Sequence, residues 1–300
     1  MQELDLVKLN FSTQGLWVLN IALAIVMFGV ALGITLDDFK RLIKLPRLLF
    51  LGLLSQFVLL PLVTFAFVWA TNPQPSIALG MFMVAACPGG NISNFMTHLA
   101  KGNTALSVSL TAFTTLMAIV MTPFNFQLYS SLHQPTAGLL RDVALSPVEV
   151  LKVVGMVLGL PLILGMLVRY RFPERGIKLS KGLKPFSIVV FVAIVCIAFS
   201  KNFDVFTGYV DRVLVLGIGH NILALFLGWC LAKSFGVSLM DRKAITLETG
   251  IQNSGLGLLL IFTFFDGLGG MAIMAAFWGI WHVVSGLVLA YVWSFKTTTH

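Results

Sequence analysis

Long apolar runs divide this chain, and they limit the folds that it can adopt. Of its 300 residues, 58% are hydrophobic and only 11% are charged, whereas about 25% are charged in a typical soluble domain. Runs of roughly 17–25 apolar residues can cross a bilayer as a helix. The sequence therefore predicts an all-α polytopic membrane protein, a single transmembrane unit over residues 1–300. About nine transmembrane helices are expected: Leu16–Ile34, Leu48–Ala70, Ile77–Ala100, Thr104–Tyr129, Val148–Val168, Phe186–Ser200, Val213–Ala232, Ile245–Phe265 and Met271–Ser294.

The sixth run is the shortest. Merging or splitting runs would change whether the number of transmembrane spans is odd or even.

Polar residues interrupt two of the other runs. The stretch Glu248–Leu256 brings a carboxylate, amides, a hydroxyl and glycines into the eighth run, and Cys87–Asn94 brings Pro, Gly, Asn and Ser into the third. A buried ionisable group is expensive at membrane depth unless it faces a cavity or a partner, so Glu248 is predicted to bind a cation. Interrupted spans in different halves of a membrane protein indicate the binding site of a transporter.

The two interrupted runs are five spans apart, so they are expected to cross the membrane in opposite directions. That arrangement is typical of an inverted-repeat transporter, in which two discontinuous helices cross near the midplane. The amino termini of half-helices offer the positive ends of their dipoles to anions, and the unwound carbonyl groups can coordinate cations. The sequence therefore predicts cation and anion chemistry in one place.

The distribution of basic residues predicts the orientation of the chain. Short cytoplasmic loops carry an excess of Lys and Arg. Of the 20 Lys and Arg residues, the side that holds the amino terminus has only Lys8, Arg141, Lys152, Lys201 and Arg212. The amino terminus is therefore expected outside the cell membrane and the carboxyl terminus in the cytoplasm, with residues 169–184 as a cytoplasmic loop and residues 130–147 as an external one. This bias explains the net charge of +8 without a nucleic-acid partner.

Several motifs resemble the bile acid:sodium symporter family. They are Ala85–Asn94, Ala100–Ser107 with Thr111, Glu248–Asn253, and Ser55-Gln56 followed by Leu60-Pro61. The resemblance covers nearly the whole chain. It implies a core domain, expected at about residues 48–129 and 213–294, that rocks against a panel domain at about residues 16–34 and 148–200. It also implies symport of sodium with an organic anion: a bile-acid-like molecule, a sulfated steroid, or a small carboxylate such as pantoate or pyruvate.

The resemblance implies two sodium sites. The first would use Ser93, Asn94, Ser107, Thr111 and Glu248, and the second would use Gln56, Glu248, Gln252 and the carbonyl groups of Thr249 and Ile251. Elementary chemistry agrees with such sets, because sodium is a hard cation that prefers oxygen ligands. Neutral oxygens from hydroxyl and amide groups also spare the site a second buried charge.

The anion needs hydrogen-bond donors where the helices cross. Asn91 and Asn253 lie beside the two unwound stretches, and both are predicted to bind the substrate. His282 in the last run is a third candidate. Bacterial relatives tend to have an asparagine after the corresponding histidine, but Val283 stands there in this chain. We therefore expect a smaller contribution from His282.

Two other classes of function are alternatives to sodium symport for such a chain. An intramembrane enzyme would need a nucleophile with a base, or paired carboxylates, inside the spans. Glu248 is the only carboxylate that the sequence predicts to be clearly buried, so no enzyme is expected. A proton-coupled or exchange-type carrier of related fold is a nearer alternative. The neutral oxygens around Glu248 favour sodium symport over that alternative.

Overall fold

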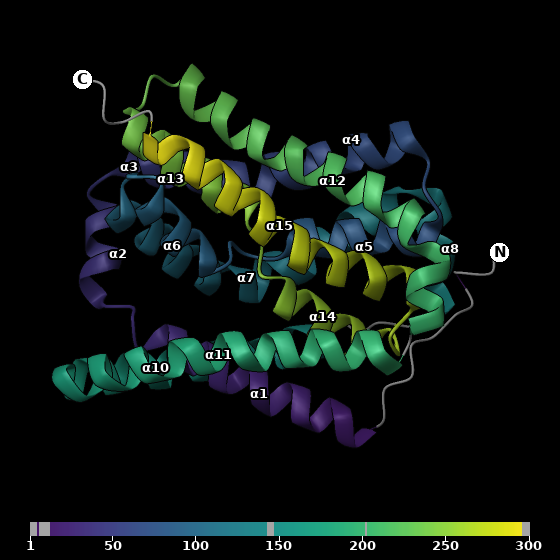
Figure 1. The fold of residues 1–300 in the computed structure, drawn as a ribbon, viewed down its shortest axis with the longest axis horizontal. Coiled ribbons are helices and arrows are strands. Elements are labelled where there is room, and N and C mark those ends of the chain that lie inside the picture. Colours follow the sequence, from purple (N-terminus) through teal and green to yellow (C-terminus); the bar gives the residue numbers. More distant parts are fainter. Residues whose placement is uncertain (1–4, 6–12, 143–146, 202, 296–300) are drawn as a thin grey trace.

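The structure of the protein is a computed structural model that describes residue 5 and residues 13–142, 147–201 and 203–295 (Figure 1). Within these ranges the regular structure is helical, apart from one isolated antiparallel bridge between Gly89 and Gln252. The predicted all-α class is therefore confirmed for the described residues. The elements are α1 (Thr13–Ala31), α2 (Leu36–Ile43), α3 (Pro46–Leu54), η2 (Ser55–Leu59), α4 (Leu60–Thr71), α5 (Pro75–Ala86), α6 (Ile92–Leu99), α7 (Thr104–Leu132), α8 (Gln134–Asp142), α9 (Pro147–Val154), η3 (Gly155–Gly159), α10 (Leu160–Arg171), α11 (Pro173–Lys201), α12 (Phe203–Ser234), α13 (Leu239–Gly250), α14 (Ser254–Phe264) and α15 (Gly269–Phe295), where η2 and η3 are short π-helical turns.

The helices follow the apolar runs of the sequence. Five helical stretches in the described part are long and apolar enough to cross a membrane: Pro46–Thr71, Thr104–Leu132, Leu151–Arg171, Val213–Ser234 and Gly269–Phe295. The shorter apolar helices α5 and α14 belong to the interrupted runs. In Figure 1, α1 begins at one end of the molecule and α15 ends at the opposite end. This agrees with an odd number of crossings, and the count of nine stays a prediction.

The two polar stretches do interrupt their helices. The third run is divided into α5 and α6, and the eighth into α13 and α14. The chain passes from α5 to α6 in one direction and from α13 to α14 in the opposite direction (Figure 1). The bridge between Gly89 and Gln252 joins the two interruptions. The structure thus brings together the two segments that the sequence marked as unusual.

Two segments that we expected to be loops are partly helical. The segment 130–147 contains α8, and the basic segment 169–184 continues α10 to Arg171 and then forms the first turns of α11. Pro173 opens α11 with Glu174 in its first turn, and both residues favour a helix start. The criterion of a long apolar run cannot detect a helix whose first turns are polar. Pro185 lies inside this helix without ending it.

The helices are arranged around the interruptions in two groups. In the smaller group α1, α10 and α11 pack against one another, and Figure 1 shows them along one side of the molecule. In the larger group α15 packs on α5, α6 and α12, and α12 packs on α13. Contacts of α1 with α14, and of η3 and α9 with α7, connect the two groups. The interruptions therefore lie where the two groups face each other.

A proline in α4 illustrates how the larger group satisfies its backbone. Pro61 has no N–H, so the carbonyl group of Phe57, four residues earlier, lacks its usual helical donor. The side chain of Asn125 on α7 donates a hydrogen bond to that carbonyl at 2.9 Å. An unsatisfied backbone group at membrane depth costs several kcal/mol. Asn125 therefore serves the packing of α7 against α4.

The close contact of α5 with α15 leads to a stability prediction. A Cβ atom at Gly80 would lie 2.8 Å from Cβ of Met274 and 3.0 Å from the backbone of Met271. We expect Gly80→Ala to lower the thermal midpoint in detergent, because overpacking costs about 1–3 kcal/mol. Gly138→Ala on α8 is the control, since no described atom outside its chain neighbours and its own helix backbone lies within 4 Å of its Cβ position. Equal midpoints for the two variants would contradict the tight packing.

Candidate functional site

The backbone at the crossing forms a small antiparallel ladder. The N–H of Gly90 donates to the carbonyl of Ile251 at 2.7 Å, and the N–H of Asn253 donates to the carbonyl of Pro88 at 2.9 Å. Each interruption thus supplies a donor and an acceptor to the other. Because backbone groups at membrane depth must be satisfied inside the protein, each unwound stretch depends on the other.

Side chains from neighbouring helices satisfy further carbonyl groups of the interruptions. The donors lie on η2, α7 and α12, so three elements that surround the crossing also hold it. The bonds, all at 2.8 Å, run from Thr122 Oγ1 to the carbonyl of Ala86, from Gln56 Nε2 to that of Cys87, and from Asn221 Nδ2 to that of Gly250.

Glu248 lies beside the crossing with 2% of its surface exposed. Its Oε2 accepts hydrogen bonds from Ser93 Oγ at 2.7 Å and from Thr111 Oγ1 at 2.9 Å, and its Oε1 lies 3.5 Å from Thr114 Oγ1. A Cβ atom at Gly89 would collide with this carboxylate, so only glycine leaves room for it. The carboxylate is therefore surrounded by hydroxyl groups from α6 and α7, the helices that flank the crossing.

Asn94 extends the same cluster. Its Oδ1 accepts from Ser107 Oγ at 2.8 Å and lies 3.1 Å from Thr111 Oγ1. Thr111 Oγ1 also lies 3.0 Å from the carbonyl oxygen of Ser107. Thr111 has one hydroxyl hydrogen for three acceptors within reach. The structure thus brings Ser93, Asn94, Ser107, Thr111 and Glu248 together in a cluster that is rich in acceptor oxygens.

The second predicted set is brought together less completely. Gln56 Nε2 donates to Gln252 Oε1 at 2.8 Å, and Gln252 Nε2 donates to the carbonyl of Thr249 at 2.8 Å. The carbonyl of Ile251 accepts from Gly90 in the ladder. The side chain of Glu248 is directed to the hydroxyl cluster instead. In this conformation the oxygens of the second set therefore bind protein donors.

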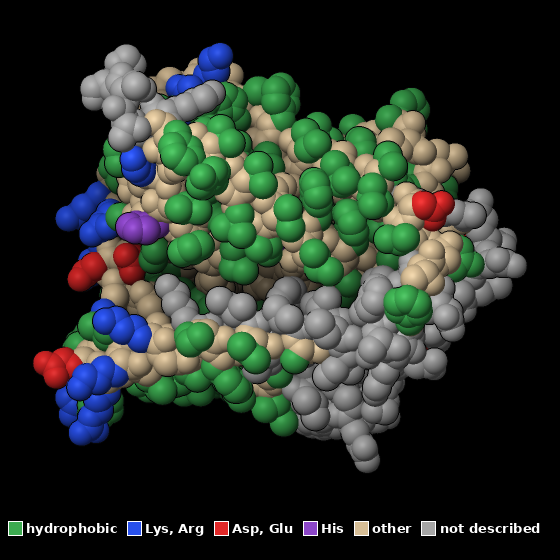
Figure 2. All heavy atoms as spheres, in the orientation of Figure 1, with side chains coloured by type: hydrophobic (Ala, Val, Ile, Leu, Met, Phe, Trp, Pro, Cys, Tyr) green, Lys and Arg blue, Asp and Glu red, His purple; other side chains and the backbone are tan. Residues whose placement is uncertain are grey.

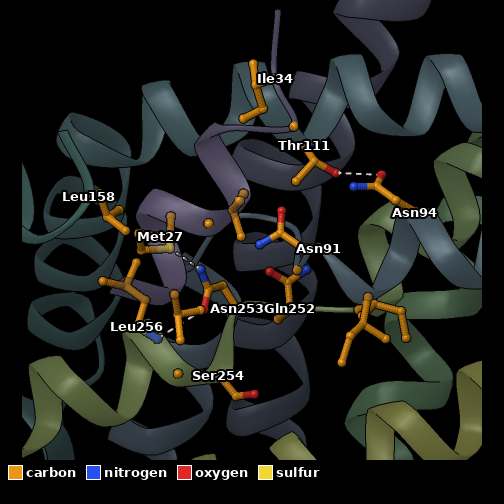
Figure 3. A pocket seen from close by; sticks show the side chains of 18 of the residues that line it. Met27, Ile34, Asn91, Asn94, Thr111, Leu158, Gln252, Asn253, Ser254 and Leu256 are labelled. Carbon is orange, nitrogen blue, oxygen red and sulfur yellow. Dashed lines mark hydrogen bonds between the residues drawn. The ribbon is translucent and has the colours of Figure 1, made fainter. Parts of the chain in front are cut away.

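A cavity of about 360 Å³ lies against the crossing, and Figure 3 shows the side chains around it. Asn91, Asn253 and His282, the three predicted substrate residues, all line it, and their binding of a substrate stays a prediction. Asn253 is the N-cap of α14: its Oδ1 accepts from the N–H of Leu256 at 3.1 Å, and its Nδ2 lies 3.8 Å from Sδ of Met27 on α1.

The other two predicted substrate residues differ in their surroundings. Asn91 is the N-cap residue of α6, and its side chain makes no capping hydrogen bond. His282 on α15 is only 3% exposed, and its Nδ1 has no hydrogen-bond partner among the residues that the structure describes. The first turns of α6 and α14 thus begin at the cavity, where their N–H groups and dipoles favour a negative charge.

The cavity and the hydroxyl cluster share residues. Asn94 and Thr111 belong to the cluster around Glu248 and also line the cavity, and Gln252 of the second set lines it as well. A molecule in the cavity would therefore contact side chains that hold the carboxylate.

Sequence reasoning did not identify several side chains at this site. Thr114 and Thr97 join the cluster, and Asn221 holds the carbonyl of Gly250. Thr114 follows Thr111 by three residues, so helical spacing could have indicated it. Asn221 is a carboxamide inside an apolar run, which was also a visible signal. Ser180 of α11 lines the cavity and could not be found, because its segment was expected to be a loop.

The chemistry of these donors suits an alkali cation better than a transition metal. Among the residues that the structure describes, no group of three or more His, Cys, Asp or Glu side chains is placed to hold a metal. The first set combines one carboxylate with neutral hydroxyl and amide oxygens, which are hard ligands.

Comparison with known proteins agrees with this chemistry. The model of the Sodium Bile acid symporter family matches residues 20–209. The uncharacterized sodium-dependent transporter YocS of Bacillus subtilis is 35% identical over 278 residues, which are 93% of this chain and 83% of that protein. The ileal sodium/bile acid cotransporter of Oryctolagus cuniculus is 29% identical over 241 residues, which are 80% of this chain and 67% of that protein.

A solved structure shares the fold. The sodium proton antiporter MjNhaP1 from Methanocaldococcus jannaschii superposes with a TM-score of 0.56 at 13% identity, covering 97% of this chain and 88% of that one. At this identity the likeness shows the fold alone. The related proteins are transporters and not enzymes, as expected. On the family match and the identity to the bacterial transporter, this chain belongs to the sodium bile acid symporter family.

Proposed function

We propose that the protein is a sodium-coupled symporter that imports an organic anion by alternating access. The observation that carries this proposal is the buried carboxylate of Glu248, surrounded by hydroxyl groups and sharing Asn94 and Thr111 with a cavity. A carboxylate in such a place needs a positive partner. A cation bound there would also order the side chains that face the cavity.

In the proposed first sodium site, the ligands are Ser93, Asn94, Ser107, Thr111 and Glu248. Their oxygens already lie within hydrogen-bond distance of one another, so small movements of hydroxyl groups would turn them toward an ion. The proposed second site uses Gln56, Glu248, Gln252 and the carbonyl groups of Thr249 and Ile251. There the amides of Gln56 and Gln252 would have to exchange their mutual hydrogen bond for the ion.

The cavity supports an anionic cargo of modest size. Its volume of about 360 Å³ is near the lower end of the roughly 300–1,000 Å³ of ligand pockets. Among the organic anions considered, this volume favours a small carboxylate over a bile-acid-like molecule or a sulfated steroid. In the proposal, the amides of Asn91 and Asn253 and the first turns of α6 and α14 bind the carboxylate, and His282 contributes less.

For alternating access we propose that a core of residues 48–129 and 213–294 moves against a panel of residues 16–34 and 148–200. The two helix groups and the cavity at their junction support this division. We also propose that the chain lies in the cell membrane with its amino terminus outside. Figure 2 supports this orientation, because Lys and Arg side chains gather at the end of the molecule where α2 and α10 lie.

A charge change at Glu248 tests the cation sites. Sodium should raise the thermal midpoint of the wild-type protein relative to potassium, because a ligand of the folded state stabilises it. Glu248→Gln keeps the size of the side chain and removes its charge. We expect the apparent sodium affinity to fall at least about tenfold, or roughly 1.4 kcal/mol.

Glu174→Gln on α11 is the matched control for Glu248→Gln, since it removes a carboxylate from the first turn of a helix outside the cluster. In Glu174→Gln, sodium should still raise the thermal midpoint. If sodium stabilises Glu248→Gln as much as the wild type, Glu248 does not belong to a cation site. Uptake with and without a proton ionophore at fixed pH separates sodium symport from a proton-coupled or exchange-type carrier.

Changes at the asparagines test the anion site. Asn253→Ser keeps an N-cap oxygen for α14 but removes the amide donors, so we expect substrate-dependent uptake to be lost while sodium still stabilises the protein. Asn91→Ala should act in the same way, and His282→Ala should have a smaller effect. Asn103→Ser is the control, because Asn103 caps α7 away from the cavity. Wild-type affinity in both Asn91 and Asn253 variants would place the anion elsewhere.

Thiol labelling tests the orientation. In a background in which Cys87, Cys196 and Cys230 are replaced by alanine, Lys44→Cys follows α2 at the basic end, and Ser131→Cys is near the end of α7. An impermeant reagent applied to intact cells should label position 131 and leave position 44 unlabelled. The reverse pattern would invert the proposed topology.

A further inference from the structure

The cavity has two walls of different chemistry. The crossing and the helices around it contribute polar side chains, among them Asn91, Gln252 and Asn253. The opposite wall comes from α1 and the residues after it, from η3 and from α11, and its side chains are Val, Met, Ile and Leu with one exception among the described residues. The exception is Ser180 of α11. A lone hydroxyl on an apolar wall can contact a cargo that reaches across the cavity.

The hydroxyl of Ser180 is only weakly held by the protein. It lies 3.4 Å from the carbonyl oxygen of Gly29, which is at the long end of the range for a hydrogen bond. Gly33 stands beside it, and a Cβ at Gly33 would lie 3.7 Å from Ser180 Oγ. Because both neighbours are glycines, no side chain of theirs covers the hydroxyl. It can therefore rotate toward the cavity at little cost.

Ser180 of α11 contacts α1 at Gly29, and the place of this contact on α1 determines how far Ser180 lies from the proposed anion site. Met27 contacts Asn253 through its sulfur atom, and Figure 3 shows the two side chains together with Ile34 at a distance from them. Gly29, which Ser180 contacts, follows Met27 by two residues, which in an α-helix is a rise of about 3 Å and a rotation of about 200°. Ser180 and Met27 therefore lie toward different edges of this wall, separated both along and around α1. A cargo with a carboxylate at Asn253 and a second polar group a few bonds away could contact both Asn253 and Ser180.

We infer that Ser180 is a specificity residue that hydrogen-bonds a hydroxyl group at the end of the cargo remote from its carboxylate. The inference rests on the proposed function and narrows its cargo to small hydroxy acids with an aliphatic middle. The aliphatic part would lie against Met27, Val30 and Leu158, which are apolar lining residues of that wall. The hydroxyl group of the cargo would exchange its hydrogen bond with water for one to Ser180. The affinity for the cargo would rise because both hydroxyl groups then have a hydrogen-bond partner inside a largely apolar pocket.

A structural role is the competing explanation for Ser180. Its contact with Gly29 joins α11 to α1, so its loss could loosen the packing of these helices. Such loosening would weaken the binding of every acid to a similar extent. A specific contact would affect only the acids that carry the distal hydroxyl.

The test uses purified full-length protein in sodium and matched pairs of acids: butanoate with gamma-hydroxybutanoate, and pentanoate with delta-hydroxypentanoate. Dissociation constants come from ligand-dependent thermal stabilisation, and uptake into proteoliposomes gives a second readout. In the wild type we expect at least one hydroxy acid to bind about threefold to tenfold more tightly than its partner. Ser180→Ala should abolish this preference without changing the affinity for the plain acid, and Ser180→Thr should retain it.

Ser234→Ala is the matched control, because Ser234 Oγ also donates to a backbone carbonyl but lies at the exposed end of α12. It should keep the preference. The inference alone is overturned if plain and hydroxylated acids bind equally in the wild type, or if Ser180→Ala keeps the preference or weakens both acids alike. If no acid of either kind binds in sodium, the proposed cargo class fails together with the inference.

Discussion

The exchange of backbone hydrogen bonds between the two interruptions is the interaction on which the site depends. Inside a membrane an unwound segment has no water to satisfy its peptide groups. Here the ladder of Gly90 with Ile251 and of Asn253 with Pro88 removes that cost for both segments at once. Two half-helices can therefore begin in the middle of the protein, and the carboxylate of Glu248 lies at the point where they meet.

Sharing of residues then gives a physical basis for coupling. Asn94 and Thr111 contact the cluster around Glu248 on one side and the cavity on the other. In the proposed mechanism, a cation orders these side chains and lowers the entropic cost of binding the anion, and by linkage the anion raises the affinity for the cation by the same factor. No long pathway is needed, because the two sites have side chains in common.

The sequence was informative wherever a polar residue stood in an apolar run. Glu248 and the glycine-rich stretch after Cys87 identified the interruptions, since such residues are too costly at membrane depth to be incidental. The sequence could not identify contacts that depend on packing between distant segments. Gly89 makes room for the side chain of Glu248, which is distant in the sequence, and Ser180 reaches the cavity only because the polar start of α11 is helical. The count of crossings and the division into moving parts stay predictions.

The cap of α14 has a consequence for the kind of charge that this cavity can accept. Asn253 turns its oxygen toward the N–H of Leu256, and this leaves its NH₂ group to face the other way. To coordinate a cation in the cavity, the side-chain amide of Asn253 would have to rotate by half a turn. Helix α14 would then lose its N-cap at a cost of about 1 kcal/mol. In the proposed mechanism, this local rule of helix geometry would favour an anion over a cation at Asn253 by a similar amount, without the help of a charged side chain.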